Sequence, residues 1–234
     1  MPMNTPLAQV AIAEITHLLT TDFDSQHLLS TITERTRRAF GATWCVLVLK
    51  SVDAPGIELV CESIELGFEP PRDLVHRVPV ALSALNGSVV MIDDFDIASP
   101  RWAAFAESAA LHGLGGCRVF PLKLAQATLG SLAVFTVDPW NSRERSNAYG
   151  QSMADLAAIA LSMRGIDNRT EAATVAAQQI LLSRSTIELA AGMIAELDDL
   201  DIGSATDTMV AAAKAQGISL TQYARKMVED PGFR

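Results

Sequence analysis

The residue types that most often carry catalysis are few and dispersed in this chain of 234 residues. None of the four histidines neighbours a cysteine or a serine in a recognisable nucleophile motif. The chain also lacks the Gly-x-Ser-x-Gly and His-Glu-x-x-His motifs, and it has no glycine-rich loop between a strand and a helix. We therefore expect no catalytic residues and a protein that is not an enzyme. The histidines are His17, His27, His76 and His112.

Residues that could bind a metal or form disulfides are equally sparse. The cysteines Cys45, Cys61 and Cys117 lie 16 and 56 positions apart, which suits neither a zinc site nor a disulfide scaffold. The acidic residues of the segment 93–96 could suggest a cation site, but they also suit a turn whose carboxylates cap the chain after a strand. We expect no metal site and no cofactor.

One group of aromatic and polar-tipped residues could line a ligand pocket. Trp102, Phe105 and His112 are spaced by three and seven residues, which places them near one face of an expected helix. Phe95 precedes this helix, and Cys117 begins the next expected strand. The group predicts a small-molecule cavity. The alternative is that the same side chains simply fill the core between helix and sheet.

Charge and composition limit the partners of the chain. It has 27 acidic and 18 basic residues and a net charge of −9, whereas non-specific binding to nucleic acid or anionic membranes needs excess Lys and Arg. No stretch reaches the roughly 20 apolar residues of a membrane span, and the N-terminus lacks the basic region of a signal peptide. These features predict a cytoplasmic protein without a membrane partner.

The elements that position these residues follow from hydrophobic spacing and from proline. All ten prolines lie at or before position 139 or at position 231, so residues 140–230 are expected to be almost wholly helical. The preceding segment has the order α-α-β-β-(α)-β-α-β-β, which predicts an α+β domain with an antiparallel sheet flanked by helices. The expected helices span 7–19, 26–40 and 99–112, and the expected strands span 43–51, 57–63, 88–92, 117–124 and 129–137.

A 3-4 repeat runs through the helical half. From Leu156 to Ile194, ten of its twelve positions are apolar. A 3.5-residue period sustained this long favours a left-handed coiled coil and a homodimer through residues 141–197. The alternative is a single amphipathic helix packed on its own domain. Two shorter helices, about 203–216 and 219–229, are expected to form a compact three-helix unit with the end of the long helix.

Two strand motifs resemble the second half of a GAF domain. The segments 119–122 (Val-Phe-Pro-Leu) and 129–132 (Leu-Gly-Ser-Leu) match that family's Val-Pro-Leu and Gly-x-Leu strands, and a helix follows them as in the family. The resemblance covers about residues 8–165. It implies a small-molecule sensor or a dimerisation module, without naming the ligand.

The C-terminal residues resemble an ANTAR domain, a three-helix unit that binds RNA hairpins and prevents transcription termination. Its pattern Arg-x-x-Ile-x-x-Ala-(Lys/Arg)-Gly is occupied by Arg184, Ile187, Ala190, Ala191 and Gly192. The family's later small and apolar positions are occupied by Ala205, Met209, Ala213, Leu220 and Ala224. The two resemblances divide the chain into a GAF-like sensor (1–140), a coiled-coil signalling helix (141–180) and an ANTAR-like helical domain (181–234).

The function expected from this division is a signal-responsive regulator whose output binds RNA. The alternative is a dimeric interaction protein whose ANTAR-like unit no longer binds RNA. It is favoured by the charge of residues 180–234, where five basic against eight acidic residues give −3, and by the alanine at Ala191, where the family has Lys or Arg. The residues expected to face RNA are Arg184, Lys214, Tyr223, Arg225 and Lys226.

Overall fold

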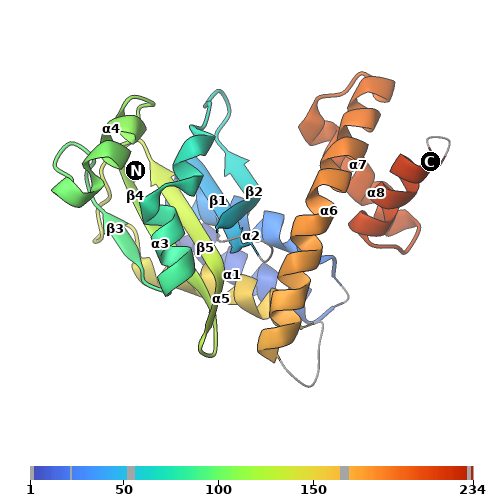
Figure 1. Cartoon of the computed structure of the whole chain (residues 1–234), viewed down its shortest axis with the longest axis horizontal. Coiled ribbons are helices and arrows are strands. Elements are labelled where there is room, and N and C mark those ends of the chain that lie inside the picture. The colour runs from blue at the N-terminus through green and yellow to red at the C-terminus, as the bar shows by residue number, and fades with distance from the viewer. Residues whose placement is uncertain (1–2, 22, 52–55, 164–168, 231–232, 234) are drawn as a thin grey trace.

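The computed structural model describes residues 3–21, 23–51, 56–163, 169–230 and 233, and for 169–183 it describes the backbone alone. An α+β domain comes first and a group of three helices follows it (Figure 1). The elements of the first part are α1 (Thr5–Leu19), α2 (Ser25–Phe40), β1 (Trp44–Lys50), β2 (Ile57–Ile64), η1 (Arg72–His76), α3 (Val78–Asn86), β3 (Val90–Ile92), η2 (Pro100–Trp102), α4 (Ala103–Ala110), β4 (Gly116–Leu124), β5 (Ala127–Thr136) and α5 (Asn147–Ser162). The three helices are α6 (Arg169–Asp198), α7 (Ile202–Ala215) and α8 (Leu220–Glu229).

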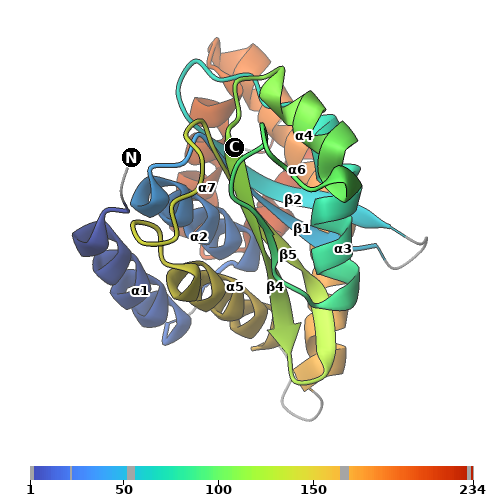
Figure 2. The ribbon, with the colours of Figure 1, turned by 90° about the vertical axis from the view of Figure 1, so that its left-hand side faces the viewer.

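The five strands form one antiparallel sheet in the order β2-β1-β5-β4-β3. Helices cover both faces, so the central strands read as continuous apolar runs. Figure 2 shows α1, α2 and α5 on one side of the sheet and α3 and α4 on the other. The predicted α+β fold with a flanked antiparallel sheet is confirmed.

Strand alternation assigns each side chain to one of the two faces. In β1, Cys45 and Leu47 pack on the α1/α2/α5 face, whereas Trp44 and Val46 pack on the α3/α4 face. Each face therefore has its own hydrophobic core. The helix ends follow local capping rules: Asp24 caps α2 at its N-terminus, and Gly41, with a φ of 58°, ends it.

The region 141–197, predicted to be helical, contains two helices, α5 and α6, which pack against each other. The coiled coil and the homodimer stay predictions. The face of α5 that includes Met153, Ala157 and Leu161 is fully buried in the core of the α1/α2/α5 face. The middle of the predicted repeat, 164–183, lies outside the described residues or side chains.

The predicted three-helix unit is confirmed, and it consists of α6, α7 and α8. The later end of the 3-4 repeat, Ile187, Ala191 and Ile194, is buried in the core of this unit instead of facing a second chain. Packing within one chain thus accounts for this end of the repeat. The rest of that core includes Ala205, Met209, Ala213, Leu220, Tyr223, Ala224 and Met227.

Among the described residues, no helix has the length and hydrophobicity needed to cross a membrane.

Candidate functional site

Four of the five predicted pocket residues meet on the α3/α4 face of the sheet. Phe95, Trp102, Phe105 and Cys117 are all buried in the core of this face. The rings of Phe95 and Phe105 meet edge to face with centroids 5.8 Å apart. His112 is exposed instead, because α4 ends at Ala110 and the chain turns there. Its Nδ1 lies 2.9 Å from the carbonyl oxygen of Ser108.

The aromatic group extends onto the sheet through two residues that sequence spacing did not single out. Phe135 on β5 lies 6.4 Å from Phe105, between ring centroids, and stacks at 4.6 Å on Trp44 of β1. A row of aromatic rings therefore runs from Phe95 to Trp44. Their separation in sequence explains why spacing along one helix could not find them.

Polar groups meet this aromatic face at two points. The Nε1 of Trp44 donates to a carboxylate oxygen of Glu62 at 2.9 Å, and Arg72 donates to the other oxygen at 2.7 Å. The hydroxyl of Ser83 on α3 is fully buried and has no hydrogen-bond partner within the described part of the chain. Apart from the exposed His112, the side chains predicted to line a pocket therefore pack within the hydrophobic core of this face.

The cysteines are not nucleophiles or metal ligands in this state. Burial raises the pKa of Cys117 to about 12 and that of Cys61 to about 11, and it also raises the pKa of Cys45. Each thiol therefore stays protonated at neutral pH and packs as a small apolar group. No cluster of His, Cys, Asp and Glu side chains suited to a metal ion occurs among the described residues.

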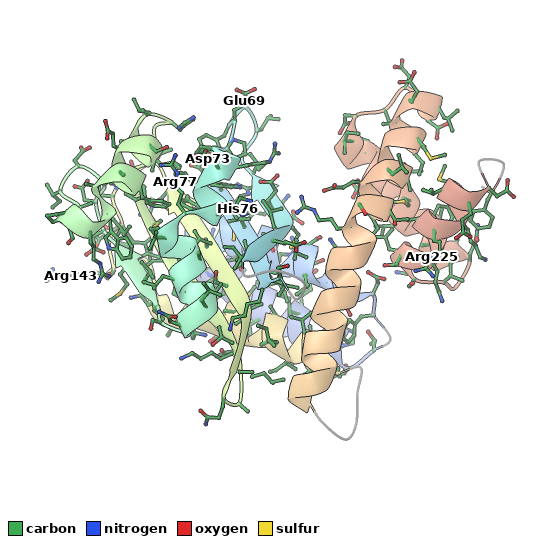
Figure 3. The ribbon with its side chains drawn as sticks, viewed as in Figure 1. Glu69, Asp73, His76, Arg77, Arg143 and Arg225 are labelled. Atoms are coloured by element: carbon green, nitrogen blue, oxygen red, sulfur yellow. The ribbon has the colours of Figure 1, made fainter. Side chains whose placement is uncertain are left out.

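The five predicted RNA-facing residues are placed in three different environments. Lys214, Arg225 and Lys226 are exposed on α7 and α8 (Figure 3 labels Arg225). Tyr223 is only 4% exposed, and its ring packs against Phe233 in the core of the unit. Arg184 is one-third exposed and pairs with Glu188 on its own helix at 2.8 Å.

The three-helix unit contacts the sensor at the beginning of α2. Asp24 accepts a hydrogen bond from the backbone N–H of Leu220 at 3.2 Å, a contact between residues 196 positions apart. Helix α6 also packs against α5 and the edge strand β2. Asp24 is recognisable from the sequence as a helix cap, but nothing in the sequence pairs it with α8.

Comparison with known proteins agrees with this architecture. The family model described as the GAF domain matches residues 24–161, which is more than half of the chain. No characterised protein sequence matches the chain. The match ends before α6, so the resemblance of the C-terminal unit to an ANTAR domain stays a prediction.

Three solved structures share the fold, at identities so low that they show the fold alone. The phycoerythrobilin-bound GAF domain from a cyanobacterial phytochrome has a TM-score of 0.54 and 16% identity, and the alignment covers 67% of this chain and 95% of that one. Free methionine-R-sulfoxide reductase from Neisseria meningitidis, in complex with its substrate, has a TM-score of 0.51, 17% identity, and coverages of 74% and 90%. The chromophore-binding domain of an unusual bacteriophytochrome from R. palustris has a TM-score of 0.50 and 13% identity over 65% of this chain. The alignment spans only 59% of that protein's length. By the family match and by its fold, the chain belongs to the GAF domain family.

Proposed function

We propose that this protein is a signal-responsive regulator in which the GAF domain senses a small molecule and the three-helix unit binds RNA hairpins as an antitermination output. The observation that carries the proposal is the direct packing of the three-helix unit on the sensor, through α6 against β2 and α8 against Asp24. A change in the sensor can therefore reach the output without a further component. Regulation is favoured over catalysis because the three thiols, the strongest nucleophiles of the sensor, stay protonated at neutral pH.

The sensing half rests on the aromatic face. Its ring contacts and the unpartnered hydroxyl of Ser83 suit an aromatic ligand that donates to or accepts from this hydroxyl. Among the similar structures, the phytochrome GAF domain is phycoerythrobilin-bound, and the reductase is in complex with its substrate.

The RNA half rests on the exposed residues Lys214, Arg225 and Lys226. Among the described residues of the unit, their charges are the groups exposed for phosphate binding, and Arg184 adds a fourth if its pairing with Glu188 opens. Tyr223 lies on the inner side of α8, and its buried ring holds this helix in the core of the unit.

Titration with paired RNA hairpins at several salt concentrations tests the RNA half. With three or four phosphate contacts, the slope of log K against log salt should be about −2 to −3, at roughly −0.7 per contact. The double substitution Arg225→Glu with Lys226→Glu should abolish binding. The matched control, Lys123→Glu with Arg143→Glu, reverses two exposed charges on the sensor, and Figure 3 shows Arg143 far from Arg225. The proposed RNA output is wrong if the wild type does not bind at low salt. It is also wrong if the wild type and the Arg225→Glu/Lys226→Glu variant bind equally.

A dimeric interaction protein is the second candidate, and one observation favours it. Leu189, Leu197 and Ile202 are more than half exposed at 54%, 56% and 59%, and they lie in a stretch, 185–213, with six acidic and no basic residues. Exposed apolar side chains beside acidic residues favour binding to another protein over binding to RNA. Sedimentation at micromolar concentration decides: a dimer that Leu189→Ser and Leu197→Ser dissociate supports this candidate, and a monomeric wild type excludes it.

A further inference from the structure

We infer that the first turn of α2 is a regulated docking site for the N-terminus of α8, and that the sensor controls the three-helix unit by holding or releasing it there. The docking itself is read from contacts within the chain, and only its consequence for RNA rests on the proposed function. We refer to Asp24, Ser25, Gln26 and Leu220 as the α2–α8 junction.

Asp24 serves two helix N-termini with one carboxylate. Its Oδ1 accepts from the N–H of His27 at 3.0 Å and so caps α2, while its Oδ2 accepts from the N–H of Leu220 at 3.2 Å. Leu220 is the first residue of α8, so its N–H has no acceptor within that helix. Both helix dipoles place positive ends at this carboxylate.

The contact supplements a complete cap on α8. Ser219 accepts from the N–H of Gln222 at 3.1 Å, and the Gln222 side chain accepts from the N–H of Ser219 at 3.0 Å. This capping box holds the start of α8 without any help from the sensor. Asp24 is therefore not needed to form α8, and its bond to Leu220 specifically holds α8 on the sensor.

A second contact lies along α6, which packs against β2. Arg184 on this helix is one-third exposed and pairs with Glu188 at 2.8 Å. In the docked state, this ion pair occupies the guanidinium.

A β-bulge links the junction to the edge strand. The register between β1 and β2 shifts from Leu47↔Cys61 to Val48↔Leu59, which leaves Val60 as the extra residue. The carbonyl of Val60 accepts from the side chain of Gln26 at 3.3 Å. Leu59 packs on the α3/α4 face that carries the aromatic site, so a shift of β2 caused by a ligand reaches α2 two residues from Asp24.

The docked state is also poised to open. The hydroxyl of Ser25 and the Oε1 of Gln26 are buried without a hydrogen-bond partner among the described residues. Buried polar atoms without partners destabilise the state that contains them, and water can satisfy both if the first turn of α2 becomes exposed. The bond to Leu220 and the orphaned atoms therefore act in opposite directions, as expected of a two-state element.

The substitution Asp24→Asn tests the docking. Asparagine caps a helix as well as aspartate does, so α2 is preserved, but the charge that attracts the Leu220 N–H is lost. Amide exchange at Leu220 should rise about tenfold. Pulsed electron spin resonance between spin labels at Glu58→Cys on β2 and Glu229→Cys on α8 should show longer distances. Asp201→Asn is the matched control, because Asp201 caps α7 within the unit through the N–H groups of Gly203 and Ser204.

Opposite effects of two variants make the test decisive. Ser25→Ala removes an orphaned hydroxyl and should slow Leu220 exchange about threefold. The inference is overturned if Asp24→Asn leaves exchange and label distances unchanged, if Asp201→Asn changes the distances equally, or if Ser25→Ala accelerates exchange.

RNA binding is measured separately on the same variants. If release exposes Arg184, Asp24→Asn should bind paired hairpins about tenfold more tightly than wild type, and Asp201→Asn should not. If no variant binds RNA at low salt, the proposed output is wrong, while exchange and distances still decide the docking. If RNA binds and Asp24→Asn does not change its affinity although it opens the junction, control of the output by docking is overturned.

Discussion

The substitution Ile187→Ala distinguishes a core residue of the three-helix unit from a dimer-seam residue. Ile187 is 8% exposed and packs within the core formed by α6, α7 and α8. Replacing a buried isoleucine by alanine costs about 2–5 kcal/mol, and we take about 3 because the residue lies at the edge of its core. A unit of this size has only about 3–5 kcal/mol of its own stability. About 1 kcal/mol then remains, which leaves roughly 15% of molecules with the unit unfolded.

Leu189→Ala is the matched control, two residues along the same helix. Leu189 is 54% exposed, so its truncation should change the free energy of unfolding by less than about 0.5 kcal/mol. Amide exchange of α7 and α8, followed by mass spectrometry at two protein concentrations, is the assay. Ile187→Ala should accelerate exchange by about two orders of magnitude at both concentrations, since 1.4 kcal/mol is a factor of ten. Equal effects of the two substitutions, or an effect of Ile187→Ala that vanishes at high concentration, would refute the intramolecular core.

Four further outcomes follow from the described structure. Gly150→Ala should destabilise the sensor by about 1–3 kcal/mol in thermal unfolding, because the new Cβ would lie 2.3 Å from the ring of Phe120. Gly192→Ala meets nothing within 4 Å and should stabilise the unit by about 0.5–1 kcal/mol. Ala191→Lys, which restores the family's basic residue, should instead destabilise the unit by about 3 kcal/mol or more in urea unfolding, because Ala191 is 2% exposed in the core. The raised pKa of Cys61, from 9.0 to about 11, means that the folded state binds this proton more tightly. The free energy of unfolding should therefore fall as pH rises from 9 toward 11, and Cys61→Ala should flatten that fall in urea titrations.

Local patterns predicted the elements well because the forces that form them are local. Apolar runs bounded by turn residues located the strands, and the helix ends lie at residue types that cap helices, such as Asp24, Gly41 and Ser219. The small and apolar positions of the C-terminal unit, such as Ala205 and Met209, are buried as their helical spacing indicated. These assignments needed no knowledge of distant contacts.

A 3-4 repeat does not by itself identify the surface that it packs against, so the coiled coil stays a prediction. Leu156 is partly buried against the sensor core, Ile159 and Met163 are exposed, and Ile187 and Ile194 face the three-helix core. The two described ends of the repeat therefore contact separate cores, one through α5 and one through α6. Gly165, Asp167 and Asn168 lie between these helices in the sequence, and they are residue types that end or cap helices.

The candidate sites were only partly predictable, because they combine residues from distant segments. Phe105 and Trp102 were found from one helix, whereas Trp44 and Phe135 reach the same face only through the sheet register. His112 was misplaced because the end of α4 could be located only to within a few residues, and two residues decide whether a side chain faces the core.

The contacts within each unit differ in chemistry from the contacts between the sensor and the three-helix unit. Among the described residues, none belongs to both a sensor core and the core of the three-helix unit. A hydrogen bond between Asp24 and Leu220 joins α8 to the sensor. On α6, the charged side chain of Arg184 remains one-third exposed. Polar contacts of this kind exchange readily for water, whereas an apolar core would not separate without a large loss of stability. Among the described side chains, the polar contacts at the junction can thus open without unfolding either core, as a regulator requires.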